Sequence, residues 1–141
     1  MNEPKMNEPK DPPLARSDEE WRRELAPGTY QVMRCHDTER AGTSPLNAEH
    51  RDGRYACAAC GQSLFESVTK FDSGTGWPSF YAPLPGAVGT STDRSLGMPR
   101  TEVHCARCGG HLGHVFPDGP EPTGERYCMN GLALKFAPDG G

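Results

Sequence analysis

Residues 104–130, HCARCGGHLGHVFPDGPEPTGERYCMN, organise the fold of this chain. The stretch holds a C-x-x-C pair, then two histidines, a loop rich in Pro and Gly, and the run RYCMN at residues 126–130. Because side chains alternate between the faces of an extended strand, Arg126, Cys128 and Asn130 would share one face. A guanidinium, a thiol and an amide are costly to bury together without partners, so this face predicts a functional site.

The motif C-x-x-C-G occurs twice, at residues 57–61 and 105–109, and predicts a zinc site. Each pair of thiolates can fill two corners of a tetrahedron around one ion. Four sulfur ligands leave no position for water, so the metal is expected to be structural. A thioredoxin-type redox motif is disfavoured because the motif is duplicated and no βαβ pattern surrounds either copy. We therefore expect one structural Zn²⁺ with four ligands: Cys57, Cys60, Cys105 and Cys108.

Composition and charge exclude several classes of protein. The 141 residues suit a single domain, and 17 glycines with 14 prolines predict many turns. The formal net charge is −4 and no Lys/Arg block occurs, which disfavours nucleic-acid binding. No apolar run is long enough to cross a bilayer, and residues 1–16 lack the apolar core of a signal peptide. We expect a cytoplasmic protein with no membrane partner and six reduced cysteines, and we expect it to be a monomer.

Residues 17–137 are expected to form the folded domain. The preceding residues 1–16 begin with MNEPK twice and are rich in Pro and charge, which predicts a disordered tail. Residues 138–141 are expected to be a C-terminal tail. The run SDEE at residues 17–20 is a capping box, and it predicts a helix that continues to about residue 25.

The rest of the domain is predicted to be antiparallel β structure, because short extended runs alternate with turn signals. The helix should end at Pro27-Gly28, and Asp52-Gly53 should make a hairpin turn. Residues 82–100 are predicted to be a long loop with few core candidates. The expected strands are residues 30–34, 55–57, 64–71, 101–105, 111–116, 126–130 and 132–136. One face of the last strand would carry Leu132, Leu134 and Phe136.

Cys128 is the candidate nucleophile, because it lies outside the zinc motifs. A free cysteine is commonly a small buried hydrophobe, but Arg126 and Asn130 on the same face argue against that role here. A neighbouring guanidinium also lowers the pKa of a thiol and so enriches the nucleophilic thiolate.

Two histidines and a tryptophan are further candidates. His111 and His114 would face opposite sides of a regular strand, but a bulge at Gly113 would bring both to one side. Either histidine alone is more often structural than catalytic. Trp77 lies between Gly and Pro, and the sequence leaves two roles open for it: an anchor of its loop on the core, or an aromatic that faces a ligand.

Several motifs together resemble the B-type peptide-methionine sulfoxide reductases, enzymes that reduce the R epimer of methionine sulfoxide. They are the two C-x-x-C-G motifs, KFDSGTGWPSF at residues 70–80, GMPRTEV at 97–103, HLGHVFPDGP at 111–120 and RYCMN at 126–130. The likeness covers roughly residues 17–137. It implies a fold of two antiparallel sheets with a structural zinc at one end, and a role in the repair of oxidative damage to proteins.

The resemblance also implies a role for each site residue. The Cys128 thiolate would attack the sulfoxide sulfur, methionine would leave, and Cys128 would become a sulfenic acid that is recycled with thioredoxin. The other implied roles are binding or protonation of the sulfoxide oxygen by His111, His114 and Asn130, contact of Trp77 with the S-methyl group, and support of the thiolate and histidines by Arg126 and Asp118.

One departure from the family pattern concerns the second thiol. Many relatives carry a resolving cysteine where this chain has Thr75, and the remaining cysteine outside the zinc motifs is Cys35. Cys35 is therefore the candidate resolving thiol, while direct reduction of the Cys128 sulfenic acid by thioredoxin is the alternative. Gly131 stands where relatives usually have Ser, and we expect no large consequence.

Two other functions are consistent with a zinc site. A non-catalytic zinc module that binds protein or nucleic acid is disfavoured by the acidic charge and by the polar neighbours of Cys128. A zinc hydrolase or deaminase is excluded because a site of four thiolates has no position for a reactive water.

Overall fold

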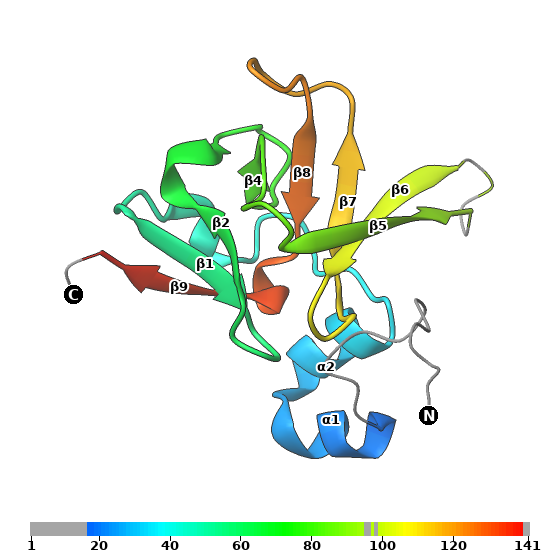
Figure 1. Ribbon diagram of the computed structural model, residues 1–141. Helices are drawn as coiled ribbons and strands as arrows, with labels where there is room; N and C mark the ends of the chain where they lie inside the picture. The colour runs from blue at the N-terminus through cyan, green and yellow to red at the C-terminus, as the bar shows by residue number, and fades with distance from the viewer. Residues whose placement is uncertain (1–16, 95–96, 98, 140–141) are drawn as a thin grey trace, which may run out of the picture.

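The computed structural model describes residues 17–94, 97 and 99–139, and this part of the chain forms two antiparallel β-sheets and two short helices (Figure 1). The predicted mainly β fold with two antiparallel sheets is therefore confirmed. The tail expected at residues 1–16 and the last residues, 140–141, lie outside the described residues. Neither helix of the described part has the length and apolar character that a membrane span requires.

The first helix, α1 (Asp18–Glu24), begins as the sequence predicts. Ser17 Oγ accepts a hydrogen bond from the Glu20 backbone N–H at 3.2 Å, and Glu20 Oε1 accepts one from the Ser17 N–H at 3.0 Å. These two bonds satisfy N–H groups that have no partner inside the helix. Trp21 on this helix is fully buried, so α1 is held to the domain by an aromatic side chain.

The second helix, α2 (Pro27–Arg34), replaces the strand predicted at residues 30–34, and that prediction was wrong. Pro27 begins α2 and does not simply end α1, because a proline at the first helical position has a suitable φ and needs no hydrogen-bond donor. Tyr30 and Met33, three residues apart, both lie buried on the core side of the helix.

The smaller sheet has three strands in the order β2-β1-β9. They are β1 (Gly53–Cys57), β2 (Ser63–Glu66) and β9 (Leu134–Pro138). The hairpin predicted at Asp52-Gly53 is absent from this described segment, because a 3₁₀ helix, η2 (Pro45–Ala48), precedes β1. Gly53 serves close packing instead: a Cβ there would lie 2.3 Å from the backbone oxygen of Ala137.

The larger sheet has six strands in the order β3-β4-β8-β7-β6-β5. Strand β5 lies within residues 82–100, which were predicted to be a loop, so that prediction was wrong. The sequence of β5, VGTSTD, lacks the alternation of apolar and polar residues by which a strand is recognised. The strand predicted at residues 64–71 is divided by a 3₁₀ helix, η3 (Ser67–Thr69). The six strands are β3 (Lys70–Phe71), β4 (Ser79–Phe80), β5 (Val88–Asp93), β6 (Arg100–Cys105), β7 (His111–Phe116) and β8 (Arg126–Met129).

An aromatic cluster joins the two sheets. Phe80 of β4 stacks on Phe65 of β2 with ring centroids 4.3 Å apart, and Tyr55 of β1 meets Phe80 edge-on at 5.0 Å. All three rings are fully buried. Leu132 does not join this core as predicted, since it lies in a 3₁₀ helix, η4 (Gly131–Ala133), and is 44% exposed.

Candidate active site

The four cysteines predicted to bind zinc lie together, in the turns that follow β1 and β6. All four sulfur atoms are within 4.8 Å of one another. Gly61 and Gly109 close the two turns with positive φ values of 83° and 79°, which glycine adopts without strain. We call this group, Cys57, Cys60, Cys105 and Cys108, the zinc clasp.

The chemistry of the zinc clasp fits a bound cation. Hydrogen bonding to the sulfurs of Cys105 and Cys108, together with burial, raises the pKa of Cys57 far above its usual range. Hydrogen bonding to Cys105 raises the pKa of Cys108 to about 12. The four thiols therefore cannot all ionise without a cation, and a divalent ion removes the conflict because it stabilises the thiolates. The predicted structural zinc site is confirmed.

Cys128 lies in β8, with β4 on one side and β7 on the other. Its register partners are Ser79 in β4 and His114 in β7. Residues directly opposite in antiparallel strands direct their side chains to the same face, so Cys128 and His114 are neighbours. A cavity of about 100 Å³ opens beside them, and its lining residues are Thr38, Trp77, Arg100, Gly113, His114, Phe116, Cys128 and Asn130.

Burial raises the pKa of the Cys128 thiol, while a hydrogen bond with Thr75 and the positive charge of Arg126 act in the opposite direction. Arg126 thus acts as predicted, but burial outweighs it. The guanidinium is held by Asp118 through two hydrogen bonds of 2.9 and 3.1 Å. It also lies over the ring of Phe116, with Cζ 4.5 Å from the ring centroid.

A β-bulge brings the two histidines to the same side of the sheet. In the pairing of β6 with β7, His104 lies opposite His111 and Val103 lies opposite Gly113, which leaves Leu112 as the extra residue. The bulge predicted at Gly113 therefore exists one residue earlier. Its result is an edge-to-face contact between the rings of His111 and His114, with centroids 5.4 Å apart.

Glu102 holds His111, and the sequence analysis did not identify this residue. Glu102 Oε2 lies 2.8 Å from His111 Nδ1, while Oε1 accepts a bond from Ser91 Oγ at 2.8 Å and lies 3.2 Å from His104 Nδ1. Burial disfavours the ionised form of Glu102, but the hydrogen bonds outweigh burial and keep its pKa well below the usual range. Glu102 is therefore a buried carboxylate that fixes the position of His111.

Asp93 holds His114 in the same way, and it too was missed. His114 Nε2 lies 2.8 Å from Asp93 Oδ2, which also forms a 3.0 Å ion pair with Arg100. Burial lowers the pKa of His114, and the hydrogen bond with Asp93 only partly opposes this. His114 is thus a poorly basic imidazole whose protonated form depends on a carboxylate.

Glu39 positions two other predicted site residues through its backbone. Its carbonyl accepts a hydrogen bond from Trp77 Nε1 at 3.0 Å, and its N–H donates to Asn130 Oδ1 at 3.0 Å. Its carboxylate accepts from the Leu132 N–H at 3.0 Å. Trp77 is therefore anchored through its N–H and also lines the cavity, so its position is compatible with both roles that the sequence left open.

Cys35 lies at the C-terminal end of α2 and is exposed. The next residue, His36, has a φ of 55° and places its ring 5.0 Å from that of His111, centroid to centroid. The end of α2 therefore lies beside the histidine pair.

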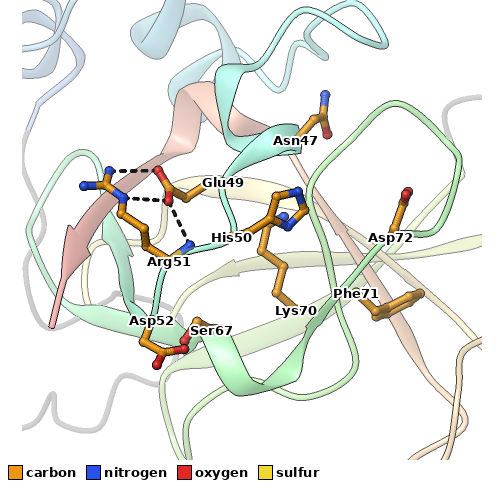
Figure 2. A pocket seen from close by; sticks show the side chains of 9 residues that line it. All are labelled: Asn47, Glu49, His50, Arg51, Asp52, Ser67, Lys70, Phe71 and Asp72. Carbon is orange, nitrogen blue, oxygen red and sulfur yellow. Dashed lines mark hydrogen bonds and ion pairs between the residues drawn. The ribbon is translucent and has the colours of Figure 1, made fainter.

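Two further pockets share lining residues with each other, and one of them also includes Trp77. The first, of about 310 Å³, is lined by residues that include Trp77, Gly42 and Lys70. The second, of about 270 Å³, is polar and also includes Lys70 in its lining (Figure 2). In Figure 2, Arg51 reaches across to Glu49, with Nε and Oε2 2.9 Å apart. Trp77 thus lines both the Cys128 cavity and the first of these pockets.

Comparisons with known proteins show the family of this chain. The model of the SelR domain family matches residues 25–138. A peptide methionine sulfoxide reductase MsrB from Leifsonia xyli is 60% identical over 128 residues, 89% of this chain and 92% of the relative. The MsrB of Agrobacterium fabrum is 52% identical over 134 residues, 94% and 99% of the two chains.

A solved structure adds a likeness of fold alone. The crystal structure of the Mis18 'Yippee-like' domain matches with a TM-score of 0.52 and 18% sequence identity, over 64% of this chain and 100% of that one. The sequence matches are evidence of family membership, because they extend over nearly the whole of both chains and more than half of the aligned residues are identical. The protein belongs to the SelR family, the family of the MsrB peptide methionine sulfoxide reductases.

Proposed function

We propose that this protein reduces the R epimer of methionine sulfoxide in oxidised proteins, with Cys128 as the nucleophile. The observation that carries the proposal is the cavity in which the Cys128 thiol lies with Trp77, His114 and Asn130. It combines a thiol, an aromatic face and two polar groups around a space that suits a side-chain tip. The pocket of about 310 Å³ that also has Trp77 in its lining offers room for residues that flank the oxidised methionine in a protein substrate.

The reaction transfers one oxygen atom and two electrons. The Cys128 thiolate attacks the sulfoxide sulfur while the sulfoxide oxygen gains a proton. The attack forms a sulfur–sulfur bond. The protonated oxygen then transfers to the Cys128 sulfur as the sulfur–oxygen bond of the substrate and the new sulfur–sulfur bond both break, so methionine leaves and Cys128 is a sulfenic acid. The methionine sulfur is reduced by two electrons and the cysteine sulfur is oxidised by two.

His114 is the proton donor in this proposal, because it lines the cavity and its ring is opposite Cys128. The pair of His114 and Asp93 can supply the proton near neutral pH. His111 is 2% exposed and sits behind His114, so it acts by holding that ring and by sharing its proton with Glu102.

Asn130 supplies a second donor to the sulfoxide oxygen. One N–H of its amide bonds the Leu112 carbonyl at 3.0 Å, and the amide has two N–H groups. Asp118 acts at a distance from the substrate, since it holds Arg126 and Arg126 favours the thiolate of Cys128.

Selectivity for the R epimer follows from the two sides of the cavity. In the productive pose the S-methyl group lies against Trp77 and the oxygen lies between His114 and Asn130. The S epimer exchanges these groups, which places a polar oxygen on the indole and leaves polar donors unpaired. An assay of both epimers with dithiothreitol as reductant tests this: we expect turnover of the R epimer alone, and equal turnover of both would reject the proposal.

We also propose that Cys35 resolves the sulfenic acid. Its thiolate attacks the Cys128 sulfur and forms a Cys35–Cys128 disulfide, while the departing hydroxide takes up a proton and leaves as water. The dithiol of thioredoxin then reduces the disulfide. Exposure of Cys35 and its position next to His36 support this route. The alternative is direct attack of thioredoxin on the sulfenic acid.

A Cys35→Ser variant separates the two routes. If Cys35 resolves, the variant keeps single turnover and dithiothreitol-driven activity but loses most thioredoxin-driven activity. Peptide mapping of the wild-type protein after one turnover should then show a Cys35–Cys128 disulfide. Unchanged thioredoxin-dependent activity in the variant would leave Cys128 as the only redox-active thiol.

We propose that residues 17–137 are the reductase domain and that residues 1–16 are a tail. The C-terminal tail expected at residues 138–141 begins later than expected, because Pro138 belongs to β9 and pairs with Gly53. We also propose that the protein acts in the cytoplasm as a monomer, without a nucleic-acid or membrane partner. The acidic net charge of −4 supports the exclusion of nucleic acid.

A further inference from the structure

A group of three side chains behind the active site has the composition of a metal site. One ligand atom from each of His36, Glu102 and His111 lies within 4.8 Å of the other two. Glu102 is 5% exposed and His111 is 2% exposed, while His36 is open to solvent. Two imidazoles and one carboxylate are a recurrent ligand set for divalent first-row transition metals, and they leave further positions for water.

The spacing of the groups suits one shared ion. The ring centroids of His36 and His111 are 5.0 Å apart. Two imidazoles bound to one ion through bonds of about 2.0–2.1 Å place their centroids roughly 5 Å apart. His111 Nδ1 and Glu102 Oε2 are 2.8 Å apart, close to the separation of about 3 Å between adjacent ligands on a six-coordinate ion. A cation would take the place of the proton that these two atoms share.

The surroundings of Glu102 resemble those of a metal ligand. Ser91 and His104 both bond its Oε1 atom, which leaves Oε2 directed toward His111. Such outer hydrogen bonds orient a carboxylate ligand before the metal arrives. His36 has its ring beside that of His111. Its φ is 55°, a left-handed conformation that is uncommon for residues other than glycine.

We propose that His36, Glu102 and His111 form a second metal site, which binds one divalent first-row transition ion and thereby inhibits the enzyme reversibly. The inhibition rests on the proposed function, whereas the binding does not. An ion held by His111 prevents that ring from sharing a proton with Glu102. It also fixes the ring of His111, which packs edge-on against the ring of His114, with centroids 5.4 Å apart.

Two thiols compete with this assignment. Cys128 lies beside His114, and Cys35 precedes His36, so either could bind a metal together with a histidine. The binding experiment therefore uses zinc-loaded protein with the double substitution Cys35→Ser and Cys128→Ser. In this background the thiols that remain are those of the zinc clasp.

The first measurement is a calorimetric titration of that protein with Co²⁺. We expect one Co²⁺ per chain beyond the resident zinc, without the thiolate-to-cobalt charge-transfer band that displacement of zinc from the clasp would produce. Adding His36→Asn should weaken Co²⁺ binding at least about tenfold, since a ligand is lost. The matched control is His50→Asn, an exposed histidine in the pocket of Figure 2 that belongs to no metal-ligand group found among the described residues.

The control should leave Co²⁺ affinity unchanged. No additional Co²⁺, or equal affinity with and without His36, would overturn the site. A charge-transfer band that accompanies all of the binding would place the ion in the zinc clasp and would overturn it as well.

The second measurement tests inhibition in protein with both thiols intact. Single-turnover formation of methionine by the zinc-loaded protein, without added thiol, is followed at rising Co²⁺ concentration. Each rate is expressed relative to the rate of the same variant without added Co²⁺. The Co²⁺ concentration for half inhibition should rise at least about tenfold in His36→Asn and stay unchanged in His50→Asn. Binding without inhibition would overturn the inhibitory role alone. Wild-type protein that forms no methionine in the absence of added Co²⁺ would reject the proposed function and leave the binding result unaffected.

Discussion

The zinc clasp and the Cys128 site are both built around cysteine, but they are assembled in different ways. The zinc clasp comes from two copies of one short motif, and each copy closes on itself through a glycine turn. The Cys128 site draws on β4, β5, β6, β7 and β8 and on the segment after α2. A local pattern thus determines the first site, and sheet register determines the second.

The two sites also differ in how they manage charge. In the zinc clasp, hydrogen bonds between the sulfurs raise the pKa of Cys57 and Cys108 and lower that of Cys105, so the four thiols do not all ionise until a cation is present. At Cys128 one thiol is buried among polar groups, and Arg126 with Thr75 only partly offsets the cost. The first arrangement is suited to holding a metal permanently, whereas the second is suited to a thiolate that forms transiently and reacts.

Replacement of the nucleophile should separate the sites most sharply. We expect Cys128→Ser to lower sulfoxide reduction by at least about a thousandfold, because a hydroxyl ionises far less readily than a thiol. Zinc content and melting temperature should remain close to those of the wild type, since the zinc clasp is untouched. Turnover near the wild-type rate would move the chemistry to another residue.

Replacement of a zinc ligand should have the opposite profile. Cys105→Ser leaves three sulfur ligands around the ion and should lower the free energy of unfolding by several kcal/mol, because metal binding is coupled to folding. Zinc analysis and thermal unfolding, each with and without a chelator, measure the effect. A variant that loses zinc but keeps the wild-type melting temperature would show that the clasp does not stabilise the fold.

Glu39, in the segment after α2, contacts two residues that line the cavity. Two substitutions distinguish the role of its carboxylate as a hydrogen-bond acceptor from the role of its negative charge. Glu39→Ala removes the acceptor of the Leu132 N–H and should destabilise the protein by about 1–3 kcal/mol. With Trp77 and Asn130 less firmly held, kcat/KM should fall roughly tenfold. Glu39→Gln keeps an acceptor oxygen, so its melting temperature and kcat/KM should stay much closer to the wild type. Equal losses in both variants would assign the role to the charge.

The difference between the sites also explains what the sequence could predict. The four zinc ligands follow from motif spacing, and Cys128 follows from its separation from those motifs. Glu102 and Asp93 could not be found in the same way. Glu102 becomes a partner of His111 only through the register of β6 with β7, and Asp93 lies in a strand without apolar alternation.

The errors in the fold have similar causes. Residues 30–34 contain β-forming side chains, but burial of Tyr30 and Met33 against the rest of the domain favours α2. The bulge lies at Leu112 because that side chain is fully buried in the core, a constraint that comes from tertiary packing. Tertiary contacts therefore decide the features that local patterns leave open.

The pH dependence of kcat/KM should sharpen the comparison, because the rate depends on the protonation states of groups in the Cys128 site and not on those of the zinc clasp. The reaction needs the Cys128 thiolate and protonated His114. Burial raises the pKa of the first and lowers that of the second. As pH rises through the pKa of His114, the gain in thiolate is offset by loss of the proton donor, so the rate stops rising. Above the pKa of Cys128 only the loss continues, and the profile is a low plateau with two falling limbs.

Asp93→Asn tests this account. Without the carboxylate the pKa of His114 should fall further, which moves the acid limb to lower pH and lowers the plateau, by roughly tenfold for each unit that the pKa falls. The alkaline limb belongs to Cys128 and should stay in place. A plateau that falls with no displacement of the acid limb would indicate that Asp93 only supports Arg100 and the local structure.

The smallest effect is expected at Asp118, at the solvent-exposed end of the Cys128 site. Asp118 pairs with Arg126 through two hydrogen bonds, but its side chain is 65% exposed, and solvent weakens such pairs. Arg126 is also held over Phe116, so Asp118→Asn should leave the guanidinium near Cys128 and lower kcat/KM only a few-fold. Thiolate titration by ultraviolet absorbance should show the pKa of Cys128 almost unchanged.

Arg126→Gln is the matched comparison: removal of the cation itself should raise the pKa of Cys128 and lower the rate more. If Asp118→Asn were as damaging as Arg126→Gln, Asp118 would be required to position the guanidinium, and the stacking on Phe116 would not suffice.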